Sequence, residues 1–155
     1  METKRYKLGE FWTECRKKGM IPPIEIMEKE SELLLQGKEY IDIPISIIEE
    51  MQQQKLLDDK RNLEEHDISS HRLAGIRLEK CDTIAAIKEY EECINLGESS
   101  GFDLFHSYAH AYSRIITLLH KIKDYDKEIK YIKDYLSHEI SEKEREKYTN
   151  RLNKK

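Results

Sequence analysis

His106 and His110 are the two side chains of this sequence whose spacing comes nearest to a metal-binding arrangement. Residues four apart lie on one face of a helix, where two imidazoles can approach the same ion. A third ligand is missing, because the nearest carboxylate, Asp103, falls in a loop or helix cap, and no HExxH motif is present. The pair therefore predicts polar surface, and we assign no metal ligand and no cofactor.

Nucleophilic chemistry would need Cys81 or Cys93 as a thiolate activated by a base such as His71. Cys93 falls instead on an apolar helix face, where a thiol packs as a small hydrophobic group. Gly97 and Gly101 are neither followed by Lys-Ser or Lys-Thr nor preceded by a predicted strand, so they do not form a phosphate-binding loop. The sequence predicts that the protein is not an enzyme, and no catalytic residue is assigned.

Lysines and tyrosines alternate over residues 121 to 133, a pattern that can bind single-stranded nucleic acid through charge and stacking. Asp124, Asp126 and Glu128 are interleaved with them and cancel much of the positive field. The formal net charge of the chain is -4. Nucleic acid is therefore not favoured as a partner.

Composition indicates a mainly helical chain of one ordinary domain, with 155 residues, 37% of them charged and 38% hydrophobic, and only six glycines and three prolines. The N-terminus has no apolar signal segment, and no stretch approaches the roughly 20 apolar residues that cross a bilayer. The three cysteines lack CxxC spacing, which favours reduced thiols. We expect a cytoplasmic protein without membrane contact.

An all-α fold is expected, and its N-terminal helical region comprises residues 1 to 66. The isoleucines of residues 39 to 48 also fit a strand. However, Asp42 followed by Pro44 is typical of a helix start, so we interpret the segment as helical. Glycines and prolines then delimit three predicted helices, over residues 8 to 18, 23 to 36 and 44 to 65.

Residues 67 to 155 contain two antiparallel helix-hairpins and a final helix, and are expected to form one cooperative domain with the N-terminal region. Asp67 or Ser69 is the predicted cap of the first helix. The hairpins cover residues 72 to 97 and 112 to 138, with polar corners at 80 to 82 and 122 to 124 and a loop at 97 to 104 between them. Ser141 and Glu144 have the spacing of a capping box and begin the last helix, which we expect to act as a cap.

Both hairpins resemble tetratricopeptide repeats over residues 67 to 140. In the first, Leu73-Ala74 is similar to the family's large-small pair, and Ala86, Tyr90 and Cys93 follow its small, large, small order. The second opens on Asp124-Tyr125-Asp126, like the family, but departs from it at three positions that are usually small: Ile116, Glu128 and Tyr135.

The resemblance implies a non-catalytic protein- or peptide-binding adaptor or regulatory subunit. In the family the first helix of each hairpin lines a concave groove, and the register places there His71, Gly75, Leu78, His110, Ser113, Thr117 and His120. Such a wall would hold neutral or acidic peptides, more strongly as its histidines protonate near pH of about 6.5. Alternatively, the N-terminal helices fill the groove.

A second class of function stays open. The composition of the chain, which is rich in Ile, Lys and Glu, also fits a small nucleic-acid-associated or inhibitory subunit of a larger bacterial or phage complex. The sequence does not identify the partner, the pathway or the oligomeric state.

Overall fold

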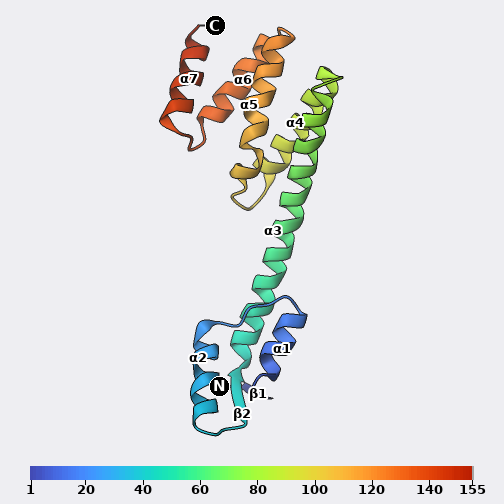
Figure 1. Ribbon diagram of the computed structural model, residues 1–155. Helices are drawn as coiled ribbons and strands as arrows, with labels where there is room; N and C mark the ends of the chain where they lie inside the picture. The colour runs from blue at the N-terminus through green and yellow to red at the C-terminus, as the bar shows by residue number, and fades with distance from the viewer. Residues whose placement is uncertain (155) are drawn as a thin grey trace. The chain divides into compact units, whose positions relative to one another are not determined.

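The computed structural model describes residues 1 to 154, in which seven helices and one two-stranded sheet follow one another along the chain (Figure 1). The chain divides into two compact units, Met1–Lys60 and Arg61–Lys155, and the division falls within the longest helix, α3 (Ile45–Leu78). Among the described residues, no helix is both long enough and apolar enough to cross a membrane. The expected all-α class is broadly confirmed, because the described chain is mainly helical, with one small two-stranded sheet in addition.

The first unit is organised around the sheet. It contains, in order, β1 (Thr3–Lys7), α1 (Glu10–Lys17), α2 (Ile24–Leu35), β2 (Tyr40–Pro44) and the first part of α3. The strands are antiparallel, with Thr3 opposite Pro44 and Lys7 opposite Tyr40. One face of the sheet packs with the helices into a small core of buried residues: Tyr6, Phe11, Cys15, Ile26, Ile41, Ile43 and Met51.

The helix start expected at Asp42 and Pro44 is wrong, because β2 occupies those residues. Ile41 and Ile43 alternate onto the buried face of the sheet, and their burial stabilises the strand. Pro44 is tolerated because hydrogen-bonded and non-hydrogen-bonded residue pairs alternate along an antiparallel sheet, and Pro44 belongs to a non-hydrogen-bonded pair. The hydrogen-bonded pair next to it joins Ile45 N to Glu2 O at 3.0 Å, so the backbone of Pro44 faces outward, where no donor is needed.

The two helices of this unit end where glycines permit a left-handed backbone. Gly19 follows α1 with φ of 69° and Gly37 follows α2 with φ of 74°. The predicted helices over residues 8 to 18 and 23 to 36 are confirmed to within about two residues at each end.

The second unit is a series of helices, each packed on the next. The rest of α3 is followed by α4 (Thr83–Ser99), α5 (Phe105–Lys121), α6 (Tyr125–Leu136) and α7 (Glu142–Asn153). Helix α5 packs on both α4 and α6, and α6 packs on α7. The predicted corners are confirmed, because Asp82, Asp124 and Ser141 accept hydrogen bonds from backbone N–H groups of the helices that they precede.

Two boundaries in this unit differ from expectation. Asp67 and Ser69 cap nothing, because α3 continues through both without a break. The predicted loop at residues 97 to 104 is shorter, since α4 includes Gly97. Its interior position has a packing reason: a Cβ atom on Gly97 would lie 2.2 Å from Cδ1 of Tyr108, so only glycine lets this ring of α5 approach α4.

Tyrosine side chains fill much of the core of the second unit. Six of them are buried there: Tyr90, Tyr108, Tyr112, Tyr131, Tyr135 and Tyr148. Where such rings are buried, their hydroxyl groups need partners. The hydroxyl of Tyr90 donates to Glu79 and that of Tyr112 donates to Glu98. Carboxylates thus satisfy the hydroxyl groups of these two tyrosines.

Candidate functional site

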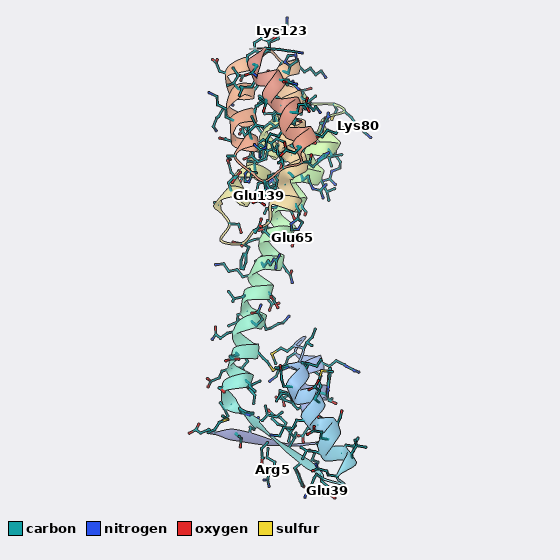
Figure 2. The ribbon with its side chains drawn as sticks, turned by 90° about the vertical axis from the view of Figure 1, so that its left-hand side faces the viewer. Arg5, Glu39, Glu65, Lys80, Lys123 and Glu139 are labelled. Atoms are coloured by element: carbon teal, nitrogen blue, oxygen red, sulfur yellow. The ribbon has the colours of Figure 1, made fainter. Side chains whose placement is uncertain are left out.

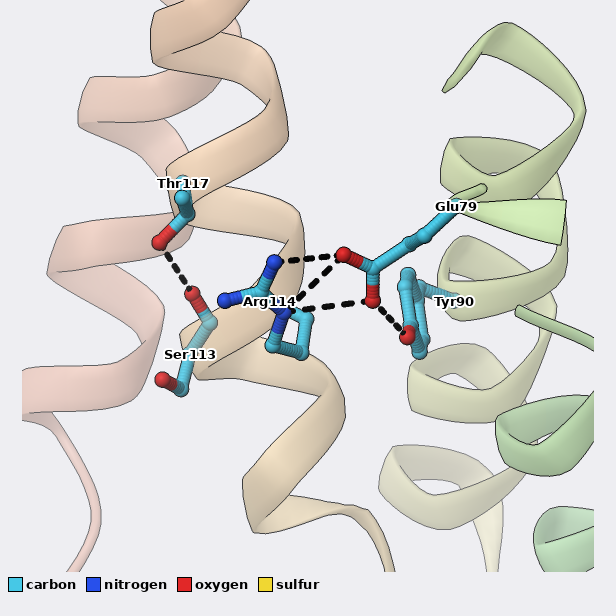
Figure 3. A network of polar contacts seen from close by, with 5 residues as sticks. All are labelled: Glu79, Tyr90, Ser113, Arg114 and Thr117. Atoms are coloured by element: carbon cyan, nitrogen blue, oxygen red, sulfur yellow. Dashed lines mark hydrogen bonds and ion pairs between the residues drawn. The ribbon is translucent and has the colours of Figure 1, made fainter. Parts of the chain in front are cut away.

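An ion pair between Glu79 and Arg114 joins three helices of the second unit (Figure 3). Glu79 immediately follows α3, and Arg114 lies on α5. The Nε atom of Arg114 lies 3.2 Å from Oε1 and 3.1 Å from Oε2 of Glu79, and its Nη2 atom lies 2.5 Å from Oε1. Tyr90 of α4 donates its hydroxyl hydrogen to Oε2. Both carboxylate oxygens are therefore engaged.

The charges of this network are fixed at neutral pH. Hydrogen bonding to Arg114 lowers the pKa of the Glu79 carboxyl. Burial, followed by the hydrogen bond to Glu79, raises the pKa of the Tyr90 phenol. An ionised carboxylate, a guanidinium and a neutral phenol then coexist, and none of them exchanges a proton near neutrality. The arrangement suits docking of helices and charge recognition rather than acid–base catalysis.

An open hollow of about 420 Å³ lies beside the ion pair, between α3 and α5. It is lined by Ile76, Glu79, Lys80, His110 and Arg114. Burial, followed by the charges of Arg72 and Arg114, lowers the pKa of the His110 imidazole. This side chain therefore gains its proton at a lower pH than an ordinary histidine does.

Of the residues predicted to line the groove, His110 alone is among those that line this hollow. His71 lies on α3 but contacts the next helix, because its Nδ1 atom is 2.6 Å from Oε2 of Glu89 on α4. Leu78 packs against the core. Gly75 is buried, and a Cβ atom there would lie 2.7 Å from the Tyr90 ring.

The other three predicted groove residues lie apart from the hollow. Figure 3 shows Ser113 and Thr117 on the side of α5 away from Glu79. The Tyr148 hydroxyl of α7 donates to Ser113 Oγ at 3.4 Å, and Thr117 bonds to its own helix. His120 Nδ1 lies 3.1 Å from Oε1 of Glu128 on α6. The predicted wall is thus divided between different neighbouring helices.

Glu79 and Arg114 are not among the site residues that the sequence predicts. One signal was present: Arg114 is the sole Lys, Arg, Asp or Glu residue within residues 105 to 120. A cation on a helix that is otherwise so apolar needs an acidic partner from another element. Glu79, beside the predicted corner, satisfies that requirement.

His106, one of the two histidines of the predicted pair, contacts a carboxylate of α3. His106 Nε2 lies 3.1 Å from Glu65 Oε1, to which Ser107 also donates at 2.9 Å. Within residues 1 to 154, no three His, Cys, Asp or Glu side chains are grouped to hold a metal ion. Burial raises the pKa of the Cys93 thiol to about 11, which keeps it protonated and unreactive.

Comparison of the chain with protein-family models, curated proteins and solved structures found no match. A functional assignment therefore depends on the chemistry of the chain's own residues.

Proposed function

We propose that this protein is a non-catalytic protein- or peptide-binding adaptor or regulatory subunit whose second unit consists of two tetratricopeptide-like hairpins. The observation that supports this proposal is the hollow between α3 and α5, the first helices of the two hairpins. In the repeat family this is the side that receives a peptide. A hydrophobic residue, Ile76, and cationic groups line the same hollow.

The chemistry of the hollow favours an acidic segment with an apolar neighbour. Arg114 uses Nε and Nη2 to bind Glu79, whereas Nη1 takes no part in these contacts (Figure 3). Lys80 is exposed at the rim. A carboxylate of the partner would meet both cations, and an aliphatic side chain would cover Ile76.

Charge reversal in the hollow tests this function. The variant Lys80→Glu/His110→Glu changes two exposed side chains of the hollow and keeps both members of the Glu79–Arg114 pair. The matched control, His66→Glu/Lys88→Glu, makes the same chemical changes at exposed positions of α3 and α4. Tagged wild-type and variant proteins are used to recover partners from lysate at moderate salt, followed by mass spectrometry.

We expect the hollow variant to lose a partner that the wild type and the control both retain, with similar melting temperatures for all three. Equal recovery by both variants would place the binding surface elsewhere. A salt-dependent mobility shift with RNA or DNA would instead favour the nucleic-acid-associated subunit.

A further inference from the structure

The outer edge of β1 has unpaired backbone groups that can accept another strand. The bonds from Ile45 N to Glu2 O and from Leu8 N to Glu39 O, both 3.0 Å, fix which residues bond across the sheet. Hydrogen-bonded pairs alternate along an antiparallel ladder, so the even-numbered residues of β1 bond with β2. The backbone groups of Thr3 and Arg5 therefore face outward, and both residues are exposed.

The opposite edge, on β2, is less suited to pairing. Pro44 faces outward there and has no N–H to donate. On β1, Lys7 N is already bonded to Glu10 Oε2 at 3.0 Å, which ends the open segment at that residue. The available edge is thus short and centred on Thr3 and Arg5.

A hollow of about 280 Å³ lies beside this edge, on the inner face of the sheet. Lys4 and Tyr6 of β1 line it together with Phe11 and Cys15 of α1 and Ile48 of α3, and no described residue of β2 does so. Polar side chains complete the same lining: Glu14, Lys18, Glu49 and Gln52. Side chains of a strand alternate between faces. A strand added to β1 would therefore direct alternate side chains to the face of Lys4 and Tyr6, where one of them can enter this hollow.

The outer face of the same edge is basic. Thr3, Arg5 and Lys7 share that face, and Arg5 Nε binds Asp42 Oδ1 of β2 at 3.0 Å. Figure 2 shows Arg5 at the sheet of the first unit. Opposite charges on neighbouring strands attract and like charges repel. Acidic side chains on the outer face of an added strand would complement Arg5 and Lys7, whereas a second copy of β1 would bring cations together.

We propose that β1 binds an extended partner peptide as a third strand, with acidic residues on its outer face and an apolar residue in the hollow beneath β1. Backbone hydrogen bonds to Thr3 and Arg5 would supply the pairing, and the hollow would select the apolar side chain. This would be a second binding site, in the first unit, independent of the one proposed between α3 and α5.

The probes are three fluorescent seven-residue peptides measured by anisotropy against the full chain at low salt. One alternates glutamate and leucine, the second alternates lysine and leucine, and the third is the glutamate peptide N-methylated at every second residue, prepared in both registers. We expect the glutamate peptide to bind about tenfold more tightly than the lysine peptide. We expect at least one N-methylated register to lose about tenfold in affinity, because its donors are blocked.

Two variants locate the binding on β1. Thr3→Pro removes an outward N–H without breaking a hydrogen bond between β1 and β2. It should lower the affinity for the glutamate peptide about fivefold. Thr3→Glu/Lys7→Glu leaves the Arg5–Asp42 pair in place and should bind the lysine peptide more tightly than the glutamate peptide. Unfolding cannot produce this gain in affinity for the lysine peptide. The Lys80→Glu/His110→Glu variant should bind the peptides as the wild type does, which separates this site from the hollow between α3 and α5.

The proposal is overturned if no peptide binds at millimolar concentration, or if both N-methylated registers bind as tightly as the parent. Unchanged binding by Thr3→Pro would overturn it too. Dimerisation of the chain that Thr3→Pro abolishes would show that the edge pairs with a second copy instead.

Discussion

The carboxylate of Glu128, which is fully buried on α6, lies 2.8 Å from Nη2 of Arg151 on α7. A second contact joins this carboxylate to His120 Nδ1 of α5 at 3.1 Å. A buried carboxylate is tolerated when its charge is paired and hydrogen-bonded. The last helix therefore supplies the guanidinium for an acid at a position where the repeat pattern expects a small residue.

Removing only one partner of this pair should be costly. Arg151→Leu leaves the carboxylate of Glu128 without its guanidinium, and we expect a loss of about 3 kcal/mol in the free energy of unfolding, measured in urea. The double variant Glu128→Leu/Arg151→Leu should recover most of that loss, because no buried charge remains. Equal stabilities of Arg151→Leu and wild type would contradict this interpretation.

A methyl group at Gly97 should disrupt the contact between α4 and α5. The Cβ atom of Gly97→Ala would meet the Tyr108 ring, and we expect a cost of roughly 1 to 3 kcal/mol despite the better helix propensity of alanine. Gly101→Ala is the control, since its Cβ atom meets nothing within 4 Å and should change stability by less than about 0.5 kcal/mol. Thermal melts of both variants give the comparison.

Helix ends in this chain were predictable because their signals are local. The caps Asp82, Asp124 and Ser141 bond to N–H groups three residues along the chain, so the sequence places both corners and the last helix. The turn at residues 122 to 124 is predictable from its cap residue. The left-handed φ of 63° at Lys123 is not, because lysine rarely adopts this conformation.

The strands were missed because their pairing is not local. Arg5 of β1 bonds to Asp42 of β2, 37 residues away, and a five-residue strand such as Thr3–Lys7 has almost no pattern of its own. The order Asp42, Pro44 fits a helix start as well as an edge strand. The neighbours of each face of α5 are likewise set by packing between elements, which a local sequence pattern does not show.

Low pH should reduce the free energy of unfolding, in part through protonation of Glu79. Because Arg114 lowers the pKa of this carboxyl from an ordinary value of 4.5, the stabilisation is fully present above that value and is lost as pH falls through the lowered pKa. Wild type should lose more stability between pH of about 7 and about 3 than Glu79→Gln does. The control is Glu92→Gln at an exposed position of α4; a wild-type pH profile parallel to that of Glu79→Gln would count against the argument.

Deleting residues 141 to 155 should cause association. The deletion removes Tyr148, which packs edge-on against Tyr135 with ring centroids 5.2 Å apart, and it also removes the guanidinium partner of Glu128. Light scattering should then detect oligomers or aggregates. Removal of residues 154 and 155 alone serves as the control, and a monomeric deletion variant with unchanged stability would show that α7 is no cap.

Thiol labelling should distinguish the three cysteines. Cys81 is exposed, whereas Cys15 and Cys93 are buried and burial raises the pKa of both thiols. A disulfide reagent should modify one thiol rapidly in the native protein and three after denaturation. Cys81→Ser should abolish the rapid phase, and persistence of that phase would mean that a second thiol is accessible.

The pairing of β1 with β2 also bears on the order of folding. Ion pairs such as Arg5–Asp42 join segments 37 residues apart, so the sheet forms only after a long loop has closed. The α5–α6 corner needs no such closure, because Asp124 caps α6 directly after α5 ends. Contacts that are local in sequence form faster than distant ones. In pulse-labelled refolding, the amides of α5 and α6 should therefore gain hydrogen-exchange protection before those of β1 and β2.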